Sequence, residues 1–213
     1  MKRIYNVLAL AGLLCAYSSS SFAQVSFSLG PRIGLNFATL SYDPDVTGAG
    51  VTKSGSIGIM IGAAAEIGFA QMFAIMVEPT YTQKGNKFEA GSAKQTISAS
   101  ELQFPVLFKV KFIQGPVRPY AFAGPNIGIV LSAKSKLEGT GNDGETDIKS
   151  TTSSTDFSLD FGGGAEFKAA PKVSITGDVR YSLGLSNLNS AAGSTQSIKA
   201  RGFQIQFGAL FHL

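Results

Sequence analysis

Eight charged residues alternate with apolar ones along this sequence and could act together in one interior. They are Arg32, Glu66, Glu78, Lys109, Asp160, Glu166, Asp178 and Arg180. Carboxylates and cationic side chains that converge inside a protein either line a path for ions or pair with one another. The sequence therefore predicts a buried charge network, which acts either as a gated ion path or as a polar plug.

The sequence offers little material for catalysis. His212 is the only histidine, and the only cysteine, Cys15, lies near the N-terminus. We expect His212 to lie beside the C-terminus, where no serine and acid complete a relay with it. Barrel enzymes exist, so the fold class alone does not decide this point. From the residues we expect no enzyme activity, no cofactor and no metal site.

The charges must be positioned by strands, and residues 101–112, ELQFPVLFKVKF, show the pattern most clearly. Apolar residues stand at every even position from Leu102 to Phe112, whereas Gln103, Lys109 and Lys111 stand at odd positions. A period of two is that of a β-strand with one apolar and one polar face. A strand of this length, rising about 3.3 Å per residue and tilted by about 45°, spans roughly 25 Å, the height of the lipid-facing band of a membrane barrel.

Seven other stretches repeat this alternation, so the sequence predicts eight strands. In the fifth stretch the apolar face begins with Tyr120 and Phe122 and changes phase at Gly124 and Pro125, where we expect a β-bulge. The predicted strands are residues 27–40, 57–69, 73–84, 101–112, 119–131, 157–167, 172–185 and 200–213.

The connections between these strands alternate in length. Short ones follow residues 69, 112 and 167, and long polar ones occupy residues 41–56, 85–100, 132–156 and 186–199. Short turns at one end and long loops at the other, with an even number of strands, are typical of outer-membrane barrels. We therefore expect an all-β fold, an eight-stranded antiparallel up-and-down transmembrane β-barrel with short periplasmic turns and long external loops.

Aromatic residues support this placement. They gather at the short turns and at the two chain ends, where they would form a girdle at one membrane interface. The expected girdle comprises Phe27, Phe69, Phe73, Phe112, Tyr120, Phe167 and Phe211.

Depth counted from the short turns brings the inward charges into neighbouring pairs. The interior of an eight-stranded barrel is just wide enough for side chains to fill, so charges there must pair or be hydrated by trapped water. We favour the polar plug and keep the narrow passive pore as the alternative. The expected pairs are Arg32 with Glu66, Glu78 with Lys109, and Asp160 with Arg180, with Glu166 and Asp178 nearby.

A soluble lipocalin-like barrel would invert the faces, with apolar residues inside and many Lys and Glu outside. Only 15% of the residues are charged and 25 are glycine. The second face is mostly Gly, Ala, Ser and Thr, which suits a crowded lumen, so we favour the membrane barrel. The net charge of +4 is scattered along the chain, and we expect no nucleic-acid partner.

Residues 1–23 have the pattern of a cleaved signal peptide. Lys2 and Arg3 precede an apolar run over residues 7–16, and residues 21–23 form a small-x-small cleavage site. A lipoprotein signal at Cys15 is disfavoured because Leu14 stands where a small residue is needed. Residues 24–213 then form one barrel domain in the outer membrane of a Gram-negative bacterium.

Six motifs spread over nearly the whole mature chain also resemble a known family. They are LGPRIGLNFATL (29–40), EPTYTQKG (78–85), ELQFPVLFKVKF (101–112), RPYAFAGPNIGIVLSAK (118–134), DFGGGAEF (160–167) and DVRYSLGLSNL (178–188). The sequence resembles the small outer-membrane proteins known as porin family or PorT-like, which are distantly similar to OmpX and OmpA barrels. The resemblance implies an eight-stranded outer-membrane barrel and assigns no activity; the link of PorT to protein secretion is not carried over.

The predicted fold and location also indicate which partners the protein contacts. We expect contact with outer-membrane lipid and with the barrel-insertion machinery, which commonly reads a C-terminal aromatic residue. This chain departs from that pattern, since it ends in Phe211, His212 and Leu213. We expect a structural or surface-recognition role through the external loops, with no ligand identified.

Overall fold

The computed structural model describes residues 25–43, 51–141, 143–191, 193 and 195–213, and these form one antiparallel sheet. The predicted signal peptide, residues 1–23, lies outside the described residues. The strands are β1 (Ser26–Asp43), β2 (Thr52–Phe69), β3 (Phe73–Val77), β4 (Thr80–Ala90), β5 (Ala93–Lys111), β6 (Val117–Glu138), β7 (Gly144–Asp147), β8 (Thr155–Ala170), β9 (Val173–Gly184) and β10 (Ser197–His212), with a short 3₁₀ helix η1 (Lys149–Thr151).

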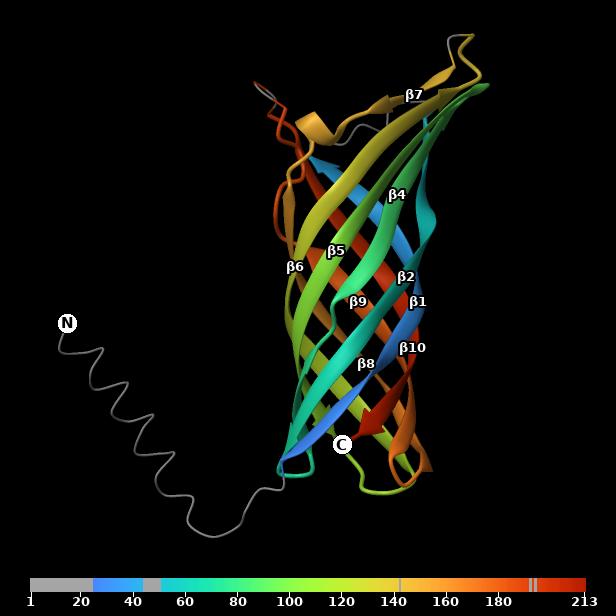
Figure 1. Ribbon diagram of the computed structural model, residues 1–213. Helices are drawn as coiled ribbons and strands as arrows, with labels where there is room; N and C mark the ends of the chain where they lie inside the picture. The colour runs from blue at the N-terminus through green and yellow to red at the C-terminus, as the bar shows by residue number, and fades with distance from the viewer. Residues whose placement is uncertain (1–24, 44–50, 142, 192, 194) are drawn as a thin grey trace, which may run out of the picture.

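The sheet closes on itself into a tall barrel (Figure 1). β1 pairs with both β2 and β10, and β5 pairs with β6, so the main strands form a continuous ring. The expected all-β antiparallel barrel is therefore confirmed. No described helix is both long and apolar enough to cross a membrane.

The sheet contains ten strands, whereas eight were expected. β3 and β4 together fill one place between β2 and β5 and are separated at Glu78 and Pro79. Proline has no N–H to donate to the ladder, which explains an interruption at this point. β7 pairs only with the upper part of β6, so eight places in the ring remain.

One wall of the barrel continues well beyond the rest, as the upper ends of β4, β5 and β6 show in Figure 1. The prediction of a long loop over residues 85–100 is wrong, because β4 and β5 remain paired up to Ala90 and Ala93. Gly91 has φ +61°, which the tight turn between them requires. Polar residues dominate this extension, so no apolar face indicated its strands in the sequence.

The alternation places apolar side chains outside and polar ones inside. Outward Ile61 and Phe207 expose more than half of their surface, at 54% and 58%. Inward Glu78 and Lys109 are fully buried. A band of exposed apolar side chains thus encircles a polar interior.

Tyr120 and Phe122 correct the expectation for the fifth predicted strand. Both side chains point into the barrel and are buried, so Tyr120 does not belong to the outer aromatic girdle. The pairing of β6 with β8 runs without a shift through Gly124 and Pro125, and the irregularity lies higher, where β6 passes Ser100 of β5. Gly162 of β8 leaves room for the ring of Phe122, whose Cζ lies where a Cβ at that position would crowd it.

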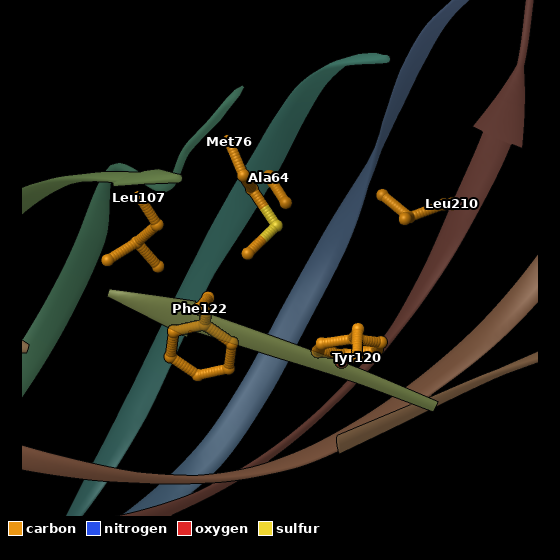
Figure 2. Close-up of a cluster of buried hydrophobic side chains, with 6 residues drawn as sticks. All are labelled: Ala64, Met76, Leu107, Tyr120, Phe122 and Leu210. Atoms are coloured by element: carbon orange, nitrogen blue, oxygen red, sulfur yellow. The ribbon is translucent and has the colours of Figure 1, made fainter. Parts of the chain in front are cut away.

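The two inward aromatic rings belong to an apolar layer that crosses the interior (Figure 2). Ring centroids of Tyr120 and Phe122 lie 6.1 Å apart. The remaining members come from four other places around the ring, on β2, β3, β5 and β10, so the layer joins opposite walls of the barrel. They are Ala64, Met76, Leu107 and Leu210.

Gly162 provides a test of this packing. A Cβ at Gly162 would lie 2.2 Å from the carbonyl oxygen of Val179 and 2.9 Å from Cζ of Phe122. We expect Gly162→Ala to lower the free energy of unfolding by about 1–3 kcal/mol, as overpacking does, measured by urea titration of the refolded barrel. Gly163→Ala is the matched control, because its nearest contact is a single backbone oxygen at 3.1 Å. Equal losses for both variants would contradict this account.

Candidate functional site in the barrel interior

All eight charged residues predicted from the sequence lie inside the barrel. None of them exposes more than 4% of its surface. Together with neighbours that the sequence analysis did not include, they form three clusters stacked along the barrel axis. We call these the lower, central and upper clusters, with the lower one nearest the end that carries the start of β1 and the C-terminus (Figure 1).

The lower cluster consists of Glu66, Lys109, Lys111, Arg118 and Glu166. Glu66 accepts hydrogen bonds from the ammonium groups of Lys109 and Lys111 at 2.8 and 2.7 Å. Glu166 lies 3.0 Å from the Lys111 ammonium and 3.9 Å from the Arg118 guanidinium. Three cations thus surround two carboxylates, and the cluster carries a positive excess.

The central cluster consists of Arg32, Glu78, Asp160, Asp178 and Arg180. Nη2 of Arg32 donates to Asp178 at 2.5 Å, and its Nε lies 3.1 Å from Glu78. Arg180 donates to Glu78 on its other side. Two guanidinium groups therefore share one carboxylate, and the excess of charge in this cluster is negative.

The upper cluster is built around Lys84. The ammonium group of Lys84 lies 2.7 Å from Glu101 and 2.8 Å from Asp156. The hydroxyl of Ser186 donates to the second oxygen of Asp156 at 2.6 Å. The cation is therefore paired with two carboxylates, and the cluster carries a negative excess.

The apolar layer lies between the lower and central clusters, and Tyr120 connects them. Its hydroxyl donates to Asp178 at 2.9 Å, and the ammonium group of Lys109 lies 3.9 Å from the centre of its ring. A cation over an aromatic face is attracted by the ring quadrupole. The interior is thus filled by linked side chains over most of its height.

Only one of the three expected pairs is present. The structure places Asp160 and Arg180 3.6 Å apart. The pairs Arg32 with Glu66 and Glu78 with Lys109 are wrong. The register puts Arg32 opposite Gly62, four residues from Glu66, and Ala74 opposite Lys109. Long side chains also reach across the lumen to strands that are not neighbours, which counting along the chain does not capture.

Sequence reasoning left several members of the clusters out of the predicted set. Lys84 stands at the end of a predicted strand and Asp156 in a predicted loop. Neither residue is therefore flanked on both sides by the alternation with apolar residues that identified the other inward charges. Lys111 was on the polar face of residues 101–112 and could have been included. The omitted members are Lys84, Glu101, Lys111, Arg118 and Asp156.

His212 lies at the lower end between two serines. Its Nδ1 is 2.8 Å from the hydroxyl of Ser28, and its Nε2 is 2.7 Å from that of Ser174. Both ring nitrogens are therefore engaged by hydroxyl groups, and a relay to an acid would need one of them. Among the described residues, no group of three or more His, Cys, Asp or Glu is arranged to hold a metal ion.

Comparison with known proteins identifies the family. Residues 22–190 match the family described as outer membrane protein beta-barrel domain. The chain belongs to this family. The protein is thus an outer-membrane β-barrel protein of the Gram-negative type. In such barrels the short turns face the periplasm and the longer connections face outward, so the upper end is the external end.

Solved structures show the same fold. Neisserial surface protein A is 16% identical, with a TM-score of 0.50 over 87% of this chain and 96% of that one. The outer membrane protein OprG from Pseudomonas aeruginosa is 13% identical, with a TM-score of 0.57 over 90% of this chain and 97% of that one. No curated relative matches the sequence. Identities this low show that the fold is shared. The role of this protein must therefore be inferred from its barrel interior and its external end.

Glu78 is the residue on which the central cluster depends, and its neutralisation is a direct test. Glu78→Gln leaves Arg32 and Arg180 buried without their shared carboxylate, so we expect a loss of about 3–5 kcal/mol in the free energy of unfolding. The measurement is a urea titration in lipid vesicles. Glu145→Gln is the control, since Glu145 pairs with Lys134 at 2.7 Å on the exposed surface and should leave the midpoint unchanged. A small effect of Glu78→Gln would indicate a well-hydrated interior.

Proposed function

We propose that this protein is a closed, non-conducting outer-membrane barrel that acts by recognition at its external end. The observation that carries the proposal is the filled interior, in which three charge clusters and one apolar layer follow one another along the axis. Each buried cation in them contacts at least one carboxylate. Charges paired in this way hold the strands together and are poorly placed to conduct ions through the lumen.

The external end supports a recognition role. The extension of β4, β5 and β6 stands above the apolar band and offers a rigid surface there. Residues on such extensions of a rigid barrel are where binding usually resides. The PorT-like identity that the sequence resembles remains a prediction, and no role is carried over from it.

The second candidate is a narrow passive pore, and a specific observation favours it. Apart from the apolar layer, the lumen is lined by polar side chains from Ser28 near the lower end to Asn86 near the upper end. Some trapped water between these groups would provide a path for small ions. Conductance distinguishes the two candidates.

Planar-bilayer recording of the refolded protein tests the proposal. We expect no steady current from the wild type, and none from Arg32→Gln or Arg180→Gln, because the remaining side chains still fill the lumen. The same two variants should unfold at lower urea concentration, since each leaves buried carboxylates uncompensated. A steady, salt-dependent wild-type current that changes in either variant would favour the pore. Heat-modifiable migration on a gel is the control for correct folding.

Lipid is the partner that we propose for the apolar band. Ile61 lies near the middle of the outward face of β2, whereas Ile57 lies near its upper end. An arginine costs about 2–4 kcal/mol at the bilayer midplane and about 0–1 kcal/mol near an interface. We therefore expect Ile61→Arg to destabilise the protein in lipid vesicles far more than Ile57→Arg does. Similar losses for the two variants would contradict a lipid boundary at this height.

We further propose that residues 1–23 are removed on export, that the barrel-insertion machinery places the chain in the membrane, and that the protein has no enzymatic role. The environment of His212 supports the last point, because its ring contacts two serines. N-terminal sequencing of the exported protein should begin at Gln24.

A further inference from the structure

A cavity of about 160 Å³ lies at the external mouth of the barrel. Its walls come from five strands and two connections, and most of its surface is apolar. The residues that carry the argument are Leu40, Ile97, Ala133, Ile148, Leu188 and Ile198. We call this cavity the mouth pocket.

The mouth pocket lies above the band that faces lipid. On β1 and β10 the exposed apolar positions extend only as high as Phe37 and Phe203. Leu40 and Ile198 lie on the same strands beyond those residues, toward the external end, and point to the inside. The apolar lining is therefore not explained by contact with the bilayer.

Two connections form a cap on one side of the pocket. They are residues 148–153, between β7 and β8, and residues 187–191, between β9 and β10. The backbone N–H of Ser153 donates to Leu188 at 2.8 Å, and that of Ser190 donates to Thr151 at 3.1 Å. Leu188 in turn donates to Ile198 at 2.8 Å and exposes only 9% of its surface. The cap is thus tied to itself and to the barrel wall.

The floor of the pocket carries charge, and its cation is already paired. Lys84 and Glu101 line the pocket and belong to the upper cluster, where Lys84 contacts two carboxylates. An anionic ligand would have to displace one of them. The paired cation disfavours an anion, and the mostly apolar walls favour an uncharged, apolar occupant.

A shallower apolar cavity adjoins the pocket on the inner face of the β4–β5 extension. It measures about 420 Å³ and shares Tyr42 and Ile97 with the mouth pocket. The ring of Phe88 packs edge-on against Tyr42, with centroids 5.6 Å apart. An apolar surface thus leads from the outside of the protein to the mouth pocket.

We propose that the mouth pocket binds a small apolar molecule of about the size of benzene. A dry cavity of about 150 Å³ lined by Leu, Ile and Phe accepts benzene or xenon. The mouth pocket has a comparable volume, and its walls are mostly Leu, Ile and Ala, with charged and polar side chains at the floor and in the cap. The proposal rests on the recognition role at the external end and names the class of ligand for it.

Methyl NMR of the protein in lipid nanodiscs, titrated with benzene, tests the proposal. Benzene also dissolves in the bilayer, so the lipid-facing methyl groups of Ile33 and Ile59 serve as internal controls. We expect the methyl signals of Ile97, Leu188 and Ile198 to shift with saturation, and those of the controls to drift in proportion to concentration. Unsaturable, parallel drift of all these methyl groups would overturn the proposal.

Two substitutions sharpen the test. Ala133 is buried in the pocket wall, so Ala133→Phe should fill the space and abolish the saturable shifts. Leu188→Ala should enlarge the pocket, weaken benzene binding and admit naphthalene. Ala63→Phe, on the outward face of β2, is the matched control and should bind as the wild type does. Saturable shifts that persist in Ala133→Phe, with folding verified by heat-modifiable migration, would place the binding elsewhere.

The two proposals fail separately. A wild-type current in planar bilayers would refute the closed barrel and leave saturable benzene binding standing. A silent barrel whose pocket methyl groups show no saturable shift would refute only the mouth pocket.

Discussion

Compensation of charge in a narrow interior is the constraint on which this barrel depends. Glu78 illustrates it, because one carboxylate lies between Arg32 and Arg180 and touches no water-exposed surface. Burial of an ion costs several kcal/mol unless a counter-ion and hydrogen bonds are in place. The three charge clusters therefore require each strand to be at its correct register, since a one-residue slip would turn every inward charge outward.

The same compensation explains how the interior can be filled without a conventional core. Large apolar side chains face outward, and a single apolar layer crosses the lumen. Tyr120 joins that layer to both the lower and the central cluster. β8 contributes to this close packing with Gly162, which leaves space for the ring of Phe122. The small residues of β8 and the aromatic residues of β6 thus pack as one structural unit.

At the external end the apolar and polar faces of the strands are arranged differently. Above the apolar band, strand pairing continues without an apolar outer face. Backbone pairing joins β4, β5 and β6 there, and side-chain hydrogen bonds such as Gln95 to Ser135 add to it. Apolar side chains instead point inward around the mouth pocket and its cap. The reversal of the two faces at this height separates the part of the barrel that meets lipid from the part available for recognition.

The sequence by itself determined the fold class and the faces of the strands. Successive residues of a strand point to opposite sides, so alternation alone indicated that Arg32, Lys109 and Arg180 lie inside. Only the tertiary structure decided which charges meet. Strand register, and side chains long enough to cross the lumen, set the partners of Arg32 as Glu78 and Asp178. It also decided the orientation of Tyr120, because the space beside it belongs to glycines more than 40 residues away in the chain, which local patterning does not reveal.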